Sequence, residues 1–264
     1  MIRDAIGQAF ESPLTGVDIV SLVPSTTETL SALGLENKLL GITRFCVHPQ
    51  HLLSQKTIVG GTKQINWKTL DSLAPDFVLG NKEENTPAIF EALSQRNIPY
   101  FVAFPQTVDE AIQDIRTLGI LLHARHASQK IVKAIEVQRL LLQSNSLDFS
   151  YAYLIWRKPW MTINQDTFIH SMLEEAGGKN VFAGHASRYP QFHLDELKHL
   201  QPDLLFLSSE PYPFAQRHIE ELQASGFKQN IILINGEMCS WHGSRMISGL
   251  SYLQNLIQQI DNGI

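Results

Sequence analysis

Cysteine, long apolar runs and blocks of positive charge are all scarce in this chain of 264 residues. Its two cysteines are too few for a disulfide framework. No apolar run approaches the roughly 18 residues that a membrane helix needs. Lysine and arginine form no basic block and the formal net charge is −5, which argues against nucleic acid as a partner. We therefore expect a soluble protein that neither spans a membrane nor binds nucleic acid.

Signatures of common enzyme classes are also missing. No Gly-x-Gly-x-x-Gly follows the first predicted strand, and the chain has neither a Gly-Lys-Ser/Thr phosphate loop nor a Gly-x-Ser-x-Gly elbow. Cys46 and His48 stand too close along the chain to be an obvious nucleophile and base. The acidic pair Glu83-Glu84 is typical of a solvated surface. We therefore predict a protein that is not an enzyme and requires no cofactor.

The start of the chain bears on its location. Residues 1–8 carry no apolar stretch of the kind that a secretory signal has, and two acids occur within the first eleven residues. As written, the chain is predicted to be cytoplasmic. A chain from which a signal had been removed would look similar, and it would be periplasmic.

One pattern occurs in both halves of the sequence. Residues 73–79 read LAPDFVL and residues 200–206 read LQPDLLF. Each copy ends a helical run with a proline and begins an apolar run that is typical of a buried strand. Each also has an earlier strand and helix before it and a later helix and strand after it. The predicted fold class is α/β, with two Rossmann-like lobes and a ligand cleft between them, because ligands bind outside the carboxyl ends of strands and at domain interfaces.

The first lobe is expected to begin with a strand over Asp18 to Val23. Ser25 and Glu28 then have the spacing of a capping box, which predicts Ser25 as the N-cap of a helix that runs to Gly34. The start of this helix would follow the carboxyl end of a strand, where free amides favour an anionic or carbonyl-rich ligand. The alternative is that the cap only stabilises the helix.

The longest helix-compatible region, 108–144, joins the two halves and has a possible break within 123–128. The predicted domains are a first lobe over 17–119, a bridging helix over 120–146 and a second lobe over 147–264. A stiff connector of this kind permits only small closing motions.

The second lobe is predicted to open with a strand over Tyr151 to Trp156. A helix capped by Asp166 follows. The segment from Glu237 to Arg245 comes after another strand, so it too is expected at a carboxyl edge.

Together these motifs resemble one family. The run Ser-Leu-x-Pro-Ser-x-Thr-Glu over Ser21 to Glu28, the two Leu-x-Pro-Asp copies, the run Gly177 to Phe182 and the bridging helix are similar to the helical-backbone substrate-binding proteins of ABC importers. The most similar subgroup is the vitamin B12-binding type, whose relatives carry haem, ferric siderophores or metal chelates. The resemblance covers about residues 17 to 260. It implies a solute-binding protein that captures a corrinoid or related tetrapyrrole for ABC-type uptake.

The resemblance also implies where the ligand is bound. In the first lobe it points to Pro24, Ser25, Thr26, Arg44, His48, Lys82 and Glu83. In the second lobe it points to Trp156, Trp160, Tyr212, Glu237, Trp241, His242 and Arg245. Three of the four tryptophans fall in these loops. Their aromatic faces suit a flat macrocycle whose peripheral carboxylates or amides meet Arg and Lys; the alternative is that they only fill a domain interface.

A membrane permease is the partner that the resemblance implies, since each lobe of that family offers it a surface acid. The position falls on Lys68 in the first lobe and on Asp195 in the second. One docking charge is thus reversed, which leaves open an intracellular protein that binds the same kind of ligand. We expect a monomer.

Two further ligand hypotheses stay open. Cys46, His48, Cys239 and His242 are residues that zinc accepts, which would make the chain a cytosolic Cys/His metalloprotein. The commoner outcome is that both cysteines are small buried residues, and an intermediate one is His48 or His242 as an axial ligand to a macrocycle's metal. A ferric-siderophore or haem receptor is favoured if affinity depends on the cations more than on the tryptophans. The other histidines singled out, His123, His126, His193, His199 and His218, are expected to face solvent.

Overall fold

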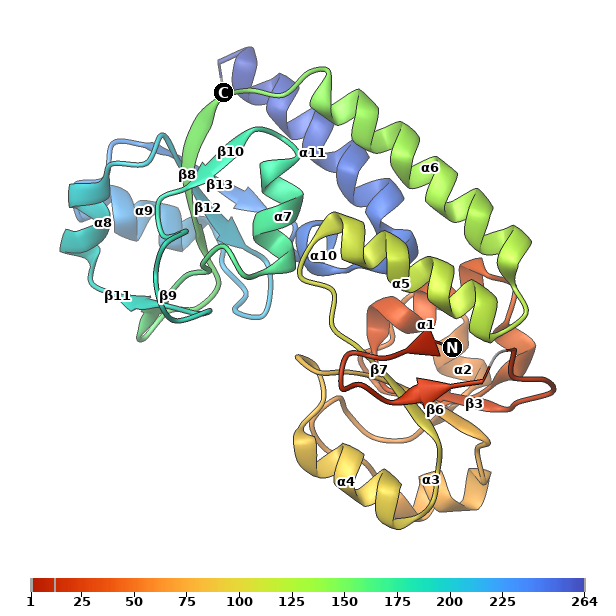
Figure 1. The fold of residues 1–264 in the computed structure, drawn as a ribbon. Coiled ribbons are helices and arrows are strands. Elements are labelled where there is room, and N and C mark those ends of the chain that lie inside the picture. Colours follow the sequence, from red (N-terminus) through yellow and green to blue (C-terminus); the bar gives the residue numbers. More distant parts are fainter. Residues whose placement is uncertain (1, 12, 264) are drawn as a thin grey trace. The chain divides into compact units, whose positions relative to one another are not determined.

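The computed structural model describes residues 2–11 and 13–263, which divide into two compact units (Figure 1). The first unit comprises the chain up to Pro105, Asp109–Ala134 and His242–Arg245. The second comprises Gln106–Val108, Ile135–Trp241 and the chain from Met246 onward. A short segment from late in the sequence therefore belongs to the first unit.

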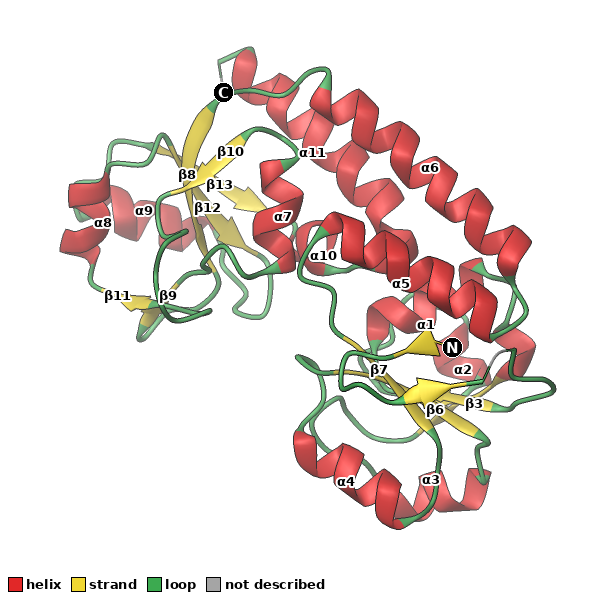
Figure 2. Cartoon of the chain, viewed as in Figure 1, coloured by secondary structure: helices red, strands yellow, loops and turns green. Residues whose placement is uncertain are grey.

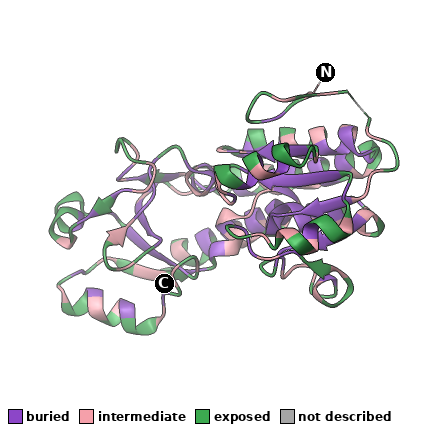
Figure 3. Cartoon of the chain, turned by 90° about the horizontal axis from the view of Figure 1, so that it is seen from below, coloured by how far each residue is buried: buried purple, intermediate pink, exposed green. Residues whose placement is uncertain are grey.

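A parallel sheet of five strands forms the centre of the first unit, in the order β5-β4-β3-β6-β7. Its strands are β3 (Ile19–Ser21), β4 (Leu39–Ile42), β5 (Thr57–Ile58), β6 (Phe77–Asn81) and β7 (Tyr100–Ala103). Its helices are α1 (Pro24–Ala32), η1 (Glu36–Lys38), α2 (Leu52–Gln55), α3 (Trp67–Leu73), α4 (Pro87–Gln95) and most of α5 (Val108–Leu121). Strands β3, β6 and β7 are buried throughout, as their nearly continuous apolar sequences predict (Figure 3).

Helices cover both faces of this sheet (Figure 2). Leu70 of α3 and Phe90 of α4 pack with Val20 and Val78 on one face. Residues of α1 and α5 lie beside Leu79 of β6 on the other face. The arrangement is the doubly wound one that a strand and helix alternation predicts.

A hairpin of β1 (Ile2–Arg3) and β2 (Ala9–Phe10) protects the β7 edge of the sheet. The Ala5 amide donates to the Val102 carbonyl at 2.9 Å, and the Val102 amide donates to Asp4 Oδ2 at 3.2 Å. Open sheet edges invite pairing with other chains, and this segment occupies one.

The second unit has a parallel sheet of four strands in the order β10-β8-β12-β13. Its strands are β8 (Phe149–Leu154), β10 (Gly178–Asn180), β12 (Leu204–Ser208) and β13 (Asn230–Ile234), with a small antiparallel pair β9 (Trp160–Met161) and β11 (Gln191–Phe192). Its helices are α7 (Phe168–Glu174), α8 (Leu194–Leu200), α9 (Gln216–Ala224), α10 (Gly236–Ser240) and α11 (Met246–Asp261). The predicted α/β class with two Rossmann-like units is confirmed.

The repeated sequence pattern has the same structure in both units. Ala74 is the C-cap of α3 and Gln201 is the C-cap of α8, and both residues adopt the left-handed conformation with φ of 46°. Asp76 Oδ2 accepts a hydrogen bond from the Asp18 amide at 2.8 Å. Asp203 Oδ2 accepts one from the Ser150 amide at 2.7 Å. Each Leu-x-Pro-Asp copy thus ends a helix and bonds the start of the next strand to the first strand of that unit's parallel sheet.

The connecting region forms two helices, α5 and α6 (Arg125–Gln143), with a break at His123, whose φ is 60°. The boundary between the units falls after Ala134, inside α6. Among the described residues, no helix combines the length and the apolar character needed to cross a membrane.

Two predicted helix caps are wrong. Helix α1 begins with Pro24 at its first position, so its N-cap is Val23, which provides no side-chain hydrogen bond. Glu28 therefore lies beyond the position that a capping box requires. In α7 the cap is Thr167, whose hydroxyl accepts from the His170 amide at 3.2 Å, one residue later than the predicted Asp166.

Candidate functional site

In the first unit, three predicted residues lie at the start of α1, directly after the carboxyl end of β3. Pro24, Ser25 and Thr26 are all buried there. Ser25 Oγ lies 3.2 Å from His242 Nε2, and Asn81 Nδ2 lies 3.3 Å from the same nitrogen. Burial lowers the pKa of His242 to about 4, so this imidazole is neutral at physiological pH.

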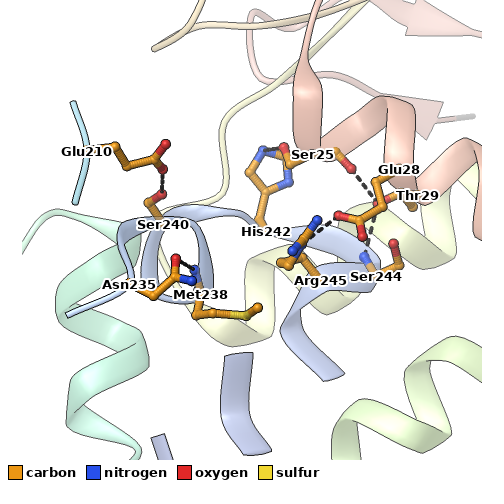
Figure 4. Close-up of polar contacts among 10 residues, drawn as sticks. All are labelled: Ser25, Glu28, Thr29, Glu210, Asn235, Met238, Ser240, His242, Ser244 and Arg245. Atoms are coloured by element: carbon orange, nitrogen blue, oxygen red, sulfur yellow. Dashed lines mark hydrogen bonds and ion pairs between the residues drawn. The ribbon is translucent and has the colours of Figure 1, made fainter. Parts of the chain in front are cut away.

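The segment His242–Arg245, which includes the short helix η2 (Gly243–Arg245), is bonded to α1 (Figure 4). Arg245 Nε lies 2.8 Å from Glu28 Oε2, and Arg245 is only 8% exposed. The Ser244 amide donates to Thr29 Oγ1 at 3.0 Å. The structure therefore brings Ser25, His242 and Arg245 together, and it favours a structural role for Arg245.

The cationic candidates of the first unit are exposed at the same edge of the sheet. Arg44 follows β4, and its guanidinium lies 6.0 Å from the Phe45 ring. Lys82 follows β6, and its ammonium lies 5.1 Å from the Phe104 ring. His48 and Glu83 are partly exposed nearby in the sequence. Strands β4 and β6 are parallel and flank β3, so the loops that follow them leave the same edge of the sheet.

In the second unit, four rings form a connected group, which we call the aromatic platform: Trp156, Trp160, Tyr212 and Phe214. Trp156 meets Tyr212 edge to face with ring centroids 5.5 Å apart, and the Tyr212 and Phe214 centroids are 4.7 Å apart. Phe214 in turn stacks on Trp160 at 6.1 Å. Trp156 is 39% exposed, so the platform presents aromatic surface to solvent.

An ion pair and a buried histidine lie beside the platform. The Arg157 guanidinium lies 5.8 Å from the Trp160 ring, and Arg157 Nη2 lies 2.6 Å from Glu221 Oε1. Phe214 was not among the predicted site residues. The prediction that His218 faces solvent is wrong, because His218 is buried against Tyr212. The sequence held two signals for these contacts. Phe214 is an aromatic residue two positions after Tyr212, and His218 lies in the first turn of the next helix.

The last predicted loop of the second unit contains the short helix α10. Asn235 caps this helix by accepting from the Met238 amide at 3.4 Å, and Ser240 Oγ donates to Glu210 Oε1 at 2.8 Å (Figure 4). Glu237 lies in its first turn, and Trp241 follows it and is partly exposed.

Both cysteines are buried, as predicted for small core residues. Thr27 Oγ1 donates to Cys46 Sγ at 3.1 Å. Burial raises the pKa of Cys46, and it raises the pKa of Cys239 to about 12, so both are thiols at neutral pH, whereas metals bind thiolates. Within the described part of the chain, no three His, Cys, Asp or Glu side chains are grouped as a metal ion would require. The Cys46, His48, Cys239 and His242 metal site stays a prediction.

Both units have parallel sheets and carry aromatic, cationic or hydroxyl side chains in the loops after their strands, an arrangement that is compatible with a solute-binding protein. The family model described as "Periplasmic binding protein" matches residues 19–232. The chain belongs to this family.

Individual relatives agree with the family. A vitamin B12-binding protein of Vibrio parahaemolyticus is 26% identical over 193 residues, which cover 72% of this chain and 70% of that protein. The crystal structure of the periplasmic vitamin B12 binding protein of Vibrio cholerae has a TM-score of 0.77 at 23% identity, covering 92% of this chain and 97% of that one. A periplasmic heme-binding protein from Roseiflexus sp. RS-1 gives 0.76 at 18% identity, covering 92% and 98%.

Proposed function

We propose that this chain captures a corrinoid or a related metal-tetrapyrrole as a transported ligand, without catalysis. The observation that carries the proposal is the aromatic platform of the second unit, with Arg157 beside it. The names of the vitamin B12-binding and heme-binding relatives support the same ligand class. The macrocycle is cargo, and no resident cofactor is part of the proposal.

Physical chemistry favours a flat ligand on this platform. Trp156 and Tyr212 offer large apolar surface at little cost in side-chain entropy, and burying such a ring contributes about 1 to 3 kcal/mol. The exposed cations Arg44 and Lys82 of the first unit suit peripheral carboxylates or amides of the same ligand. Contact of one ligand with both units stays a prediction from the family resemblance.

The proposal includes uptake through an ABC permease. Lys68 and Asp195 each occupy the second position of their helices, α3 and α8, and each lies six residues before the left-handed residue that ends the helix. Both are exposed. The two residues are therefore equivalent in the internal repeat, and we propose that the acid Asp195 contacts a permease while Lys68 presents the opposite charge. The family name indicates the periplasm, and we propose that compartment.

The second candidate is a receptor for a ferric siderophore, or for haem, that binds its ligand chiefly through cationic side chains. The observation that favours it is the pair of exposed cations Arg44 and Lys82, each beside an aromatic ring. An anionic chelate would depend on these charges more than on the platform.

The experiment is a fluorescence and absorbance titration of the purified protein with cyanocobalamin, cobinamide and haemin. We expect saturable binding of one macrocycle with Kd below about 1 μM, or roughly −8 kcal/mol. Trp156→Ala should weaken it at least about fivefold. Trp67→Phe is the control, because Trp67 is a tryptophan of the first unit that is not part of the aromatic platform. It lies on α3, where the Arg96 guanidinium is 4.4 Å from its ring. Absence of binding by all three macrocycles would overturn the proposal.

A further inference from the structure

His218 lies beneath the aromatic platform. It is the third residue of α9 and is only 3% exposed. Its ring meets the Tyr212 ring at a centroid distance of 5.4 Å and the Phe214 ring at 5.3 Å. The two platform residues that connect Trp156 with Trp160 therefore both rest on this imidazole.

The hydrogen bonds of His218 define its tautomer. The Ala215 amide donates to His218 Nδ1 at 2.9 Å, so Nδ1 carries the lone pair. The ring hydrogen is then on Nε2, which lies 3.3 Å from Tyr212 Oη and donates to it. The Tyr212 hydroxyl accepts this bond and keeps its own hydrogen for another acceptor.

Protonation would disrupt this arrangement. A second hydrogen on Nδ1 would point at the Ala215 N–H and abolish that bond. The resulting cation would be buried in the first turn of α9, where the helix dipole disfavours positive charge.

The charged neighbours of His218 oppose protonation on balance. Burial is the main cause that lowers its pKa, and Arg217 and Arg157 lower it further, whereas Glu221 raises it. Arg217 and Glu221 belong to α9, and Arg157 comes from the loop after β8. The Tyr212 hydroxyl, from the loop after β12, is an ionisable group that also contacts the ring.

We propose that His218 is a positioning residue that holds the aromatic platform in its ligand-binding form while the imidazole is neutral, and that its protonation releases Tyr212 and Phe214 and weakens ligand binding. The chemical class of the ligand rests on the proposed function above. The consequence is a binding protein that retains its ligand at neutral pH and loses affinity in acid.

The first test needs no ligand. Near-ultraviolet circular dichroism of the wild-type protein is followed from pH 8 to pH 4, with far-ultraviolet spectra to verify that secondary structure persists. We expect an aromatic transition with a midpoint below 6.5, the ordinary pKa of histidine. His218→Asn places an amide oxygen near the Nδ1 position, so it keeps the Ala215 bond and loses the contact with Tyr212. His218→Gln reaches Tyr212 instead.

Neither variant titrates, so both should lack the transition. His199→Asn, at an exposed position of α8, is the control and should behave as the wild type. A transition of the same midpoint and amplitude in His218→Asn and His218→Gln would overturn the inference.

The second test titrates cyanocobalamin at pH 7.5 and at about one pH unit below the midpoint found in the first test, where His218 is protonated. The wild type should lose about tenfold in affinity at the lower pH, the size expected for a lost hydrogen bond. His218→Gln should bind with nearly the same affinity at both pH values and recover more affinity than His218→Asn. Wild-type affinity that does not change with pH would overturn the inference. No binding at either pH would overturn the proposed function and the ligand-affinity part of the inference, whereas the ligand-free test still decides whether His218 holds the platform.

Discussion

Replacement of Asp114 by asparagine is expected to stabilise the first unit in neutral and mildly alkaline solution. Asp114 lies on α5 beside a cavity of about 10 Å³ that Thr26, Thr29 and His242 also line. Its buried Oδ2 atom has no hydrogen-bond partner among the described residues. Burial, and to a smaller extent the negative charge of Glu110, raise the pKa of Asp114 to about 7.

The sign of the effect follows from the direction of this change in pKa. The unfolded chain loses the Asp114 proton near pH 3.8, whereas the folded chain keeps it up to about pH 7. The resulting stabilisation is fully present below the unfolded pKa and is lost as the pH rises through the folded pKa. At about 1.4 kcal/mol per pH unit, this interval corresponds to about 4 kcal/mol as an upper bound. We expect a loss of about 2 to 4 kcal/mol between pH 4 and pH 8, because the cavity has about the room that one water needs, and a water would solvate the charge.

Urea unfolding at several pH values from 4 to 8 gives the free energy of unfolding of wild type and of Asp114→Asn. The contribution of Asp114 is the difference between the two proteins in the slope of this free energy against pH. Hydrogen exchange of the α5 amides assigns it to the first unit. Asp109→Asn, an exposed acid in the first turn of the same helix, is the control and should keep the wild-type slope over pH 5 to 8. Equal slopes for wild type and Asp114→Asn would refute the reasoning.

Three further outcomes are expected. Trp160→Ala should weaken binding of a flat macrocycle by about 1 to 3 kcal/mol in the fluorescence titration, and unchanged affinity would remove Trp160 from the site. Asp203→Asn should lower the free energy of unfolding by about 0.5 kcal/mol at pH 7, because hydrogen bonds from Ser150 lower the pKa of Asp203; in urea melts the difference should shrink below the unfolded pKa of 3.8 and vanish as the pH falls through the lower folded-state pKa. Arg245→Met should destabilise the first unit by about 2 to 4 kcal/mol by leaving Glu28 without this ion pair, and Glu28→Gln in the same chain should restore part of that loss.

The parallel sheets were predictable because their determinants are local. The strand expected after the first Leu-x-Pro-Asp copy and its following helix is β7, and the two copies begin β6 and β12 as expected. A buried strand can be recognised from a continuous apolar run bounded by proline or glycine, and this signal lies within about ten neighbouring residues. The same holds for Gly34, whose φ of 77° follows the end of α1.

The side-chain networks of the candidate site were less predictable because their partners are distant in the sequence. Phe214 stacks on Trp160 across more than fifty residues of chain, and the buried His218 resembled any polar residue in an amphipathic helix. Nothing in the sequence around residue 242 indicates that this segment belongs to the first unit. Such contacts depend on which strand ends are neighbours, and that is a property of the assembled sheet.

The wrong capping box shows how a distant contact replaces a local one. Ser25 and Glu28 have the spacing of a local cap, but Pro24 already starts α1, so its missing amide hydrogen removes part of the need for a capping acceptor. A cap is worth about 1 kcal/mol, whereas a charge-assisted bond in a partly buried place is stronger. Arg245, 217 residues later, offers Glu28 that bond, and His242 offers Ser25 a partner at the same sequence distance. The two side chains that a local rule assigns to one helix end therefore anchor a segment from the other end of the chain, and this anchoring holds His242 beside Ser25 and Asn81 at the carboxyl edge of the sheet.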